Sequence, residues 1–125
     1  MTKRILVVED QEDNRRIMRD LLASAGYELI EAADGEAGVR LAEAERPDLI
    51  LMDIQLPVLD GYEATRRIKQ NPELRAIPIV VVTSYALSGD DVKAMQAGSD
   101  AYVAKPFSPR ELLATIRKLL GDAKG

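Results

Sequence analysis

Cysteine and histidine, two residue types that often build reactive sites, are both absent from this chain of 125 residues. Without cysteine, disulfides and thiolate metal sites are excluded, and without histidine the chain lacks the commonest general base and zinc ligand. Any chemistry must therefore use carboxylates, hydroxyls and lysines.

Long hydrophobic runs and an excess of positive charge are absent as well. The apolar run near the N-terminus is too short for a signal peptide and no later run approaches a membrane span, so we expect a cytoplasmic protein that does not enter a membrane. The 17 basic and 21 acidic side chains give a net charge of -4, which offers no general attraction for a phosphate backbone. We therefore expect no direct DNA binding.

The length and apolar content of the chain predict one domain. A chain of 125 residues has the usual size of a domain, and 46% hydrophobic residues are enough for a sizeable core. No internal repeat, low-complexity tract or linker interrupts the sequence. We expect a single domain over residues 1–125, with its core at about 4–120 and no output domain.

Short apolar runs and helical spacing alternate along the chain. Five runs predict strands at residues 5–8, 27–33, 49–52, 77–82 and 101–104. Each is followed by a segment with helical spacing, and these segments end before Gly26, Pro47, Asn71, Gly98 and Gly121. The first helix would bury a face that includes Ile17, and the third would leave Lys69 in water. This alternation predicts an α/β fold with a doubly wound, five-stranded parallel sheet and five helices.

Polar residues stand where four of the five predicted strands end. Glu9 and Asp10 follow the first strand, Asp53 the third, Thr83 the fourth and Lys105 the fifth. Taken singly, each has an ordinary explanation, such as an Asp that caps a turn or a Lys that lies on the surface. In a parallel sheet these strand ends share one edge, where ligands gather. Jointly they favour a functional site.

The residue types at this edge favour phosphoryl transfer. Three converging carboxylates would repel one another and require a cation, and hard oxygen ligands suit Mg²⁺. Asp53 would attack phosphorus and become an acyl phosphate. The other assignments are Asp10 and Asp53 as Mg²⁺ ligands, Glu9 as a supporting residue acting through a water, the backbone carbonyl of Gln55 as a further ligand, and Lys105 and Thr83 as binders of the phosphoryl oxygens.

The motifs that carry this site resemble those of two-component response-regulator receiver domains. They are Glu9-Asp10, Leu51-Met52-Asp53-Ile54-Gln55-Leu56-Pro57, Asp60-Gly61, Val82-Thr83-Ser84 and Lys105-Pro106. The resemblance covers essentially the whole chain. Within the family, residues 48–57 and the missing output domain most resemble single-domain receivers that regulate cell division.

This resemblance implies several further properties. The sheet order would be the flavodoxin-like 2-1-3-4-5, the phosphoryl donor a histidine kinase or histidine phosphotransferase, and the only catalysis that of the chain's own phosphorylation and dephosphorylation. A cis peptide would join Lys105 to Pro106. Thr83 and Tyr102 would form a switch that changes how a downstream protein binds the face made by the fourth helix, the fifth strand and the fifth helix.

Two positions near the phosphoacceptor are less usual for the family and are expected to tune the phosphoryl lifetime. Gln55 lies two residues after Asp53, and Tyr85 lies two residues after Thr83. A ring at position 85 would reduce the access of water to the acyl phosphate, although a solvent-exposed loop tyrosine is an equally good interpretation.

Other protein classes fit the pattern less well. A haloacid-dehalogenase-type phosphatase would need an acid where Gln55 stands, and a flavodoxin-like cofactor binder would need a phosphate loop where Glu9 and Asp10 stand. A receiver that works as an unphosphorylated interaction module is the strongest alternative.

Overall fold

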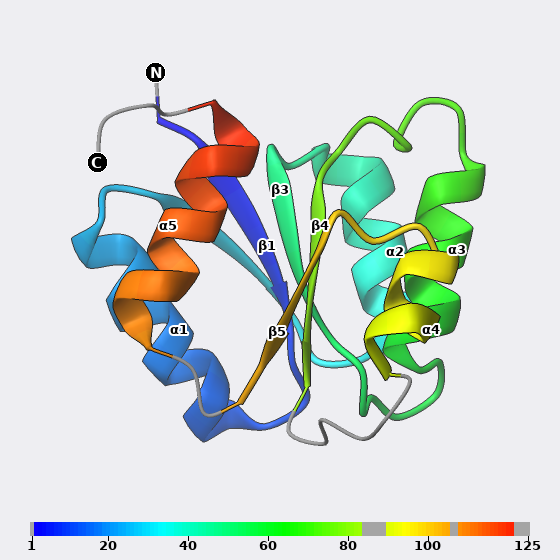
Figure 1. Cartoon of the computed structure of the whole chain (residues 1–125), viewed down its shortest axis with the longest axis horizontal. Helices are drawn as coiled ribbons and strands as arrows, with labels where there is room; N and C mark the ends of the chain where they lie inside the picture. The colour runs from blue at the N-terminus through cyan, green and yellow to red at the C-terminus, as the bar shows by residue number, and fades with distance from the viewer. Residues whose placement is uncertain (1, 84–89, 106–107, 122–125) are drawn as a thin grey trace.

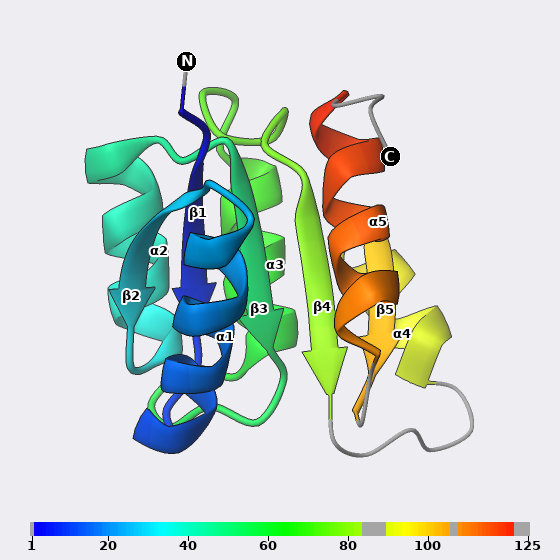
Figure 2. The same ribbon diagram turned by 90° about the vertical axis from the view of Figure 1, so that its left-hand side faces the viewer.

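The computed structural model describes residues 2–83, 90–105 and 108–121, with the backbone alone at positions 83, 90 and 91. Its strands are β1 (Arg4–Val8), β2 (Glu28–Ala32), β3 (Leu49–Asp53), β4 (Ile79–Thr83) and β5 (Ala101–Ala104). They form one parallel sheet in the order β2-β1-β3-β4-β5, so all of their carboxyl ends lie at the same edge, at the bottom of Figure 2. The predicted fold class and strand order are confirmed.

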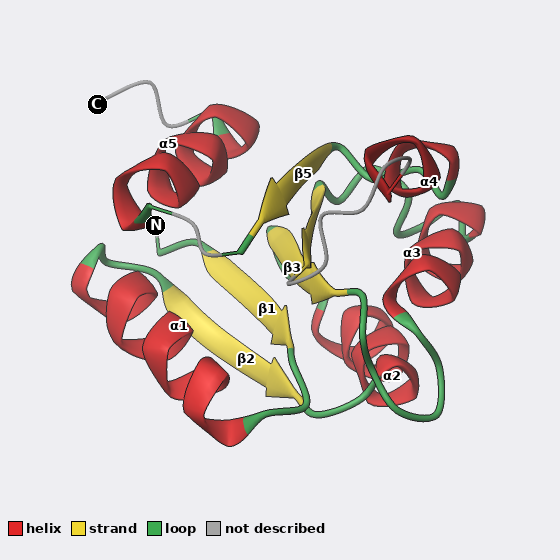
Figure 3. Cartoon of the chain, turned by 60° about the horizontal axis from the view of Figure 1, so that its bottom comes forward, coloured by secondary structure: helices red, strands yellow, loops and turns green. Residues whose placement is uncertain are grey.

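Helices cover both faces of this sheet. They are α1 (Glu12–Ser24), α2 (Gly35–Glu45), α3 (Gly61–Gln70), α4 (Asp90–Gln96) and α5 (Pro109–Leu120). Figure 1 and Figure 3 show α1 and α5 on one face and α2, α3 and α4 on the other. No helix in the described part of the chain is both long and apolar enough to span a membrane.

The hydrophobic core consists of two layers, one on each face of the sheet. Because side chains alternate along a strand, Leu6 and Val8 of β1 pack into the layer under α2 and α3, while Ile5 and Val7 pack into the layer under α1 and α5. Every residue of β3 is buried, as expected for a central strand of a parallel sheet. β2 is only partly buried, which agrees with its place at the sheet edge.

Helix starts follow side-chain caps that are visible in the sequence. Asp34, Asp60 and Ser108 precede α2, α3 and α5, and each accepts a hydrogen bond from the backbone N–H three residues later, at 2.7, 2.9 and 3.5 Å. The predicted end of the last helix is also confirmed, since Gly121 caps α5 with a left-handed φ of 77°.

Two side chains differ from their predicted surroundings. Ile17 is 60% exposed, because α1 turns only Met18 and Leu22 fully toward the sheet. Lys69 lies against the protein instead of facing water: its Nζ donates to Asp100 Oδ2 and to the Ile77 carbonyl, both at 2.8 Å. Helical spacing predicted which face of α1 and of α3 is apolar. It could not show how much of each helix surface is covered by neighbouring elements.

Candidate functional site

Asp53 is the last residue of β3 and lies at the carboxyl edge of the sheet. Its side chain is almost fully buried, and its Oδ1 accepts a hydrogen bond from Gln55 N at 3.2 Å. The chain turns immediately afterwards, where Gly61 N donates to the Ile54 carbonyl at 2.9 Å and brings the start of α3 against the end of β3. This close turn holds the carboxylate at the end of a rigid strand.

Glu9 directly follows β1 and is even more buried, at 3% exposure. Its backbone N–H continues the sheet by donating to the Ala32 carbonyl at 3.0 Å. Its carboxylate oxygen Oε2 accepts a hydrogen bond from Gln11 N at 3.1 Å. Both its backbone and its side chain are therefore held in place.

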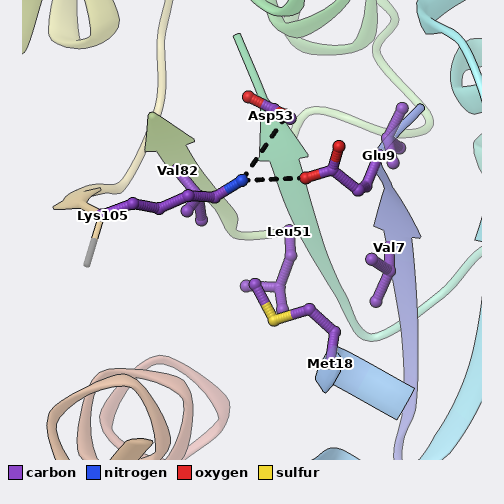
Figure 4. A pocket seen from close by; sticks show the side chains of 8 residues that line it. Val7, Glu9, Met18, Leu51, Asp53, Val82 and Lys105 are labelled. Atoms are coloured by element: carbon purple, nitrogen blue, oxygen red, sulfur yellow. Dashed lines mark hydrogen bonds and ion pairs between the residues drawn. The ribbon is translucent and has the colours of Figure 1, made fainter. Parts of the chain in front are cut away.

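Lys105 follows β5 and extends its ammonium between these two carboxylates, as Figure 4 shows. Nζ lies 2.9 Å from Glu9 Oε1 and 3.7 Å from Asp53 Oδ2. The lysine side chain is itself only 17% exposed, so its charge acts where solvent screening is weak. The arrangement partly neutralises two buried acids.

Asp10 completes an acidic cluster and lies on its exposed side. One carboxylate oxygen from each of Glu9, Asp10 and Asp53 lies within 4.8 Å of the others. The cluster borders a cleft of about 340 Å³, lined by Glu9, Asp10, Gln11, Asn14, Asp53, Gln55 and Lys105. Oxygen ligands beside a water-accessible space suit Mg²⁺, which retains several waters when bound. These residues fit a magnesium ion.

The floor of the site is apolar. In Figure 4, Val7, Leu51 and Met18 lie beneath the charged groups and Val82 lies beside the Lys105 side chain. These four residues line a void of about 10 Å³. Side chains of this kind keep water away from the lower side of the carboxylates and strengthen the electrostatic interactions above them.

The pKa values of the acids follow from this environment. Burial, followed by the hydrogen bond and the negative charge of Glu9, raises the pKa of Asp53 from 3.8 to about 6. Burial also acts to raise the pKa of Glu9, but the hydrogen bonds from Lys105 and from Gln11 N outweigh it and lower that pKa. The pKa of Asp10 is raised by partial burial and by Glu9. Glu9 therefore holds its charge most firmly.

The structure describes some of the remaining predicted site residues fully, one by its backbone alone, and others not at all. Gln55 lines the cleft, and Tyr102 of β5 stands beside Val81 of β4, half-buried against the core layer under α3. The backbone of Thr83 ends β4 at the same edge as Asp53, but its side chain lies outside the described residues. Tyr85 and Pro106, and with Pro106 the expected cis peptide, also lie outside them.

Three residues of the site were not predicted from the sequence. Gln11 and Asn14 line the cleft, and Arg15 donates from Nη1 to the Glu9 carbonyl at 2.7 Å. All three belong to the loop after β1 or the first turns of α1. Their spacing after Asp10 could have identified them. In a helix that starts at Glu12, side chains of the first turn lie close to the end of the strand that precedes the helix.

Comparisons with known proteins agree with this geometry. Residues 5–117 match the model of the response regulator receiver domain family. The chain belongs to this family. It is 46% identical over 123 residues to the polar-differentiation response regulator DivK of Brucella ovis, covering 98% of this chain and 100% of that protein. The resemblance to receiver domains, and among them to the single-domain receiver DivK, is confirmed.

Solved receiver structures are similar over nearly the whole chain. The receiver domain of a sensor histidine kinase from Pseudomonas aeruginosa, solved with a magnesium ion coordinated in its active-site cleft, has a TM-score of 0.90 and 44% identity, covering 97% of this chain and 99% of that one. A response regulator from Chloroflexus aurantiacus has a TM-score of 0.93 and 30% identity, with the same coverage of both chains. This receiver domain is thus a component of two-component signalling.

Proposed function

We propose that this receiver accepts a phosphoryl group on Asp53 from a histidine kinase or a histidine phosphotransferase. The observation that carries the proposal is the position of Asp53, a buried carboxylate at a strand end between an acidic cleft and the ammonium of Lys105. With a pKa of about 6, most Asp53 carboxylates are ionised at neutral pH and available as nucleophiles.

In the transfer, a carboxylate oxygen of Asp53 forms a bond to phosphorus while the bond from phosphorus to the donor's imidazole nitrogen breaks. The imidazole retains the electron pair of that bond. Lys105 stabilises the negative charge on the phosphoryl oxygens, with the Thr83 hydroxyl as a further donor. Burial of Asp53 over an apolar floor strengthens these interactions, because little water screens them.

Glu9, Asp10, Asp53 and the backbone carbonyl of Gln55 would hold Mg²⁺. Bound there, the ion neutralises charge that develops on the phosphoryl oxygens. Support comes from the three carboxylates of this chain and from the magnesium ion in the cleft of the Pseudomonas aeruginosa receiver. Glu9 is the most buried of the three and is paired with Lys105, which suits a supporting role.

The chain would catalyse only its own phosphorylation and the later hydrolysis of the acyl phosphate. Residues near the cleft set the lifetime of that phosphate. Gln55 lines the cleft and would affect how easily a water reaches the phosphate there. Tyr85 is proposed to shield the phosphate, so Tyr85→Ala should hasten its loss from Asp53.

Phosphorylation would act on partners through the face formed by α4, β5 and α5. The added phosphate charge attracts the Thr83 hydroxyl, and Tyr102 on the neighbouring strand moves with it. On α4, Val92 and Met95 are 53% and 71% exposed, which offers a downstream protein an apolar surface beside this switch.

Mass spectrometry of the intact protein tests the proposal. Incubation with Mg²⁺ and a small acyl-phosphate donor should add the mass of one phosphoryl group, and Asp53→Asn should prevent the gain. Asp48→Asn is a matched control, because Asp48 accepts a hydrogen bond from Arg4 N at the amino ends of the strands, away from the site. If the wild type gains no mass, the receiver works as an unphosphorylated interaction module instead.

A further inference from the structure

Arg15 joins three separate parts of the structure around the acidic cluster. From α1 it donates to the backbone carbonyl of Glu9 at 2.7 Å and contacts Glu12 Oε1 at 2.6 Å and Glu31 Oε1 of β2 at 3.4 Å. Figure 2 shows α1 lying over β1 and β2, the strands that this guanidinium links. Its side chain is 15% exposed, less than half of the 40% for Arg19 one turn later.

The contact with Glu9 is made to the backbone, and this decides what Arg15 can do. The Glu9 carbonyl belongs to the planar peptide that joins Glu9 to Asp10, so a bond that fixes the oxygen also fixes the orientation of that plane. The position of the Asp10 Cα is thereby fixed as well. Asp10 is the exposed member of the acidic cluster and the one with least burial to restrain it.

We propose that Arg15 is a positioning residue that holds the Glu9–Asp10 peptide in the orientation that brings these carboxylates together with Asp53 for Mg²⁺. The proposal rests on the magnesium site proposed above. Arg15 itself does not line the cleft and would not touch the ion. Its guanidinium suits the task because a planar fork of donors can bind several acceptors at once in a fixed geometry.

Arg19 provides a matched control in the same helix. It also pairs with Glu31 Oε1, at 2.7 Å, and with Glu12 Oε2, at 3.5 Å, but it makes no described hydrogen bond to Glu9. Arg15→Met and Arg19→Met each remove one positive charge and the contacts to the same two glutamates. They differ in the bond to the Glu9 carbonyl.

For the change in Mg²⁺ affinity when Arg15 is replaced, electrostatics alone and a positioning role predict opposite signs. Removing a cation near three carboxylates should strengthen the binding of Mg²⁺ through space, because the repulsion of the ion declines. Loss of preorganisation should weaken it. A residue that supports metal ligands without touching the metal typically contributes about tenfold or more to affinity.

Calorimetric titration of Mg²⁺ into the full chain at neutral pH tests the proposal. Arg15→Met should raise the dissociation constant about tenfold, and Arg19→Met should leave it unchanged or lower it. Arg15→Lys, which keeps the positive charge and a donor nitrogen, should restore part of the affinity. Thermal unfolding without Mg²⁺, measured on the same variants, reports stability separately.

The outcomes separate this proposal from the magnesium site itself. If Arg15→Met binds Mg²⁺ as tightly as Arg19→Met, the positioning role is wrong and the site stands. A wild type that binds no Mg²⁺ would overturn both. Should Arg15→Met fail to fold, the pair Arg15→Lys and Arg19→Lys decides, since only the first should weaken binding.

Discussion

Lys105 donates a hydrogen bond to Glu9, with Nζ 2.9 Å from Oε1, and makes a longer ion pair with Asp53, the proposed phosphoacceptor, whose Oδ2 lies 3.7 Å away. The two bonded residues are 96 positions apart in the chain. The hydrogen bond from Lys105 therefore helps Glu9 to stay ionised, and the negative charge of Glu9 helps to raise the pKa of Asp53. This competition governs the ionisation of the site.

Replacing Glu9 by glutamine should lower the pKa of Asp53. The neutral side chain removes a negative charge and leaves Asp53 as the nearest acid to Lys105. We expect the pKa to fall below about 6 but to stay above 3.8, because burial, its largest cause, remains. Carbon-13 NMR titration of the Asp53 carboxyl without Mg²⁺ measures it. Glu28→Gln, at the amino end of β2, is the control. An unchanged pKa of Asp53 in Glu9→Gln would assign the shift to burial alone.

Asp53→Asn should stabilise the metal-free protein at neutral pH. The folded-state pKa of Asp53 is about 6 against an ordinary value of 3.8, so between these values the folded protein binds more protons and loses stability as pH rises. An amide avoids this cost, and we expect a gain of about 1–3 kcal/mol in the free energy of unfolding at pH 7. In urea titrations the gain should shrink as the pH falls from about 6 toward 4. A gain that does not change with pH would contradict this origin.

Gly61→Ala should directly disturb Asp53, the proposed phosphoacceptor. A Cβ at this position would lie 2.1 Å from the Asp53 carbonyl oxygen and 2.7 Å from Ile54 Cα, so α3 must move away from the end of β3. We expect a loss of about 1–3 kcal/mol in unfolding free energy, as for other overpacked sites, together with slower phosphorylation by an acyl-phosphate donor.

Gly26→Ala is the control for this change. Gly26 has a φ of 93°, and a Cβ added there would meet no atom within 4 Å, so alanine should cost stability through backbone strain and leave phosphorylation unchanged. Equal effects of the two variants on the phosphorylation rate would show that the contact with Asp53 is not what matters.

Val58→Asn should increase stability. Val58 is a β-branched residue held at a φ of 69° in the loop after β3, and 77% of it is exposed, so little packing offsets the strain. Asparagine tolerates the left-handed region better, and we expect a gain of about 0.5–1 kcal/mol in the free energy of unfolding. Val92→Asn, the same change on exposed α4, should give no gain, and a loss at position 58 would mean that the valine makes a stabilising contact.

Thr83→Ala should separate phosphorylation from the switch. Asp53 would still accept the phosphoryl group, but the ring of Tyr102 should no longer respond, because the hydroxyl proposed to link the two is gone. NMR spectra of the Tyr102 ring before and after phosphorylation measure the response, with Thr83→Ser as the control that keeps the hydroxyl. A normal response in Thr83→Ala would exclude this coupling.

The sequence alone determined the architecture of the protein. Apolar runs, helical spacing and turn residues predicted all five strands and five helices, because these signals depend on neighbours within one or two turns. The strand ends predicted which side chains share one edge of the sheet, since parallel strands all finish on the same side. The candidate site followed from the motifs there.

Only the tertiary structure decided how those side chains divide their contacts. The pairing of Lys105 with Glu9, the bond from Arg15 to the Glu9 carbonyl and the inward course of Lys69 depend on distances between elements far apart in the sequence. Exposure of Ile17 likewise depends on what covers α1. Periodicity specifies which residues share a face, but packing in three dimensions determines which partner lies within hydrogen-bonding distance.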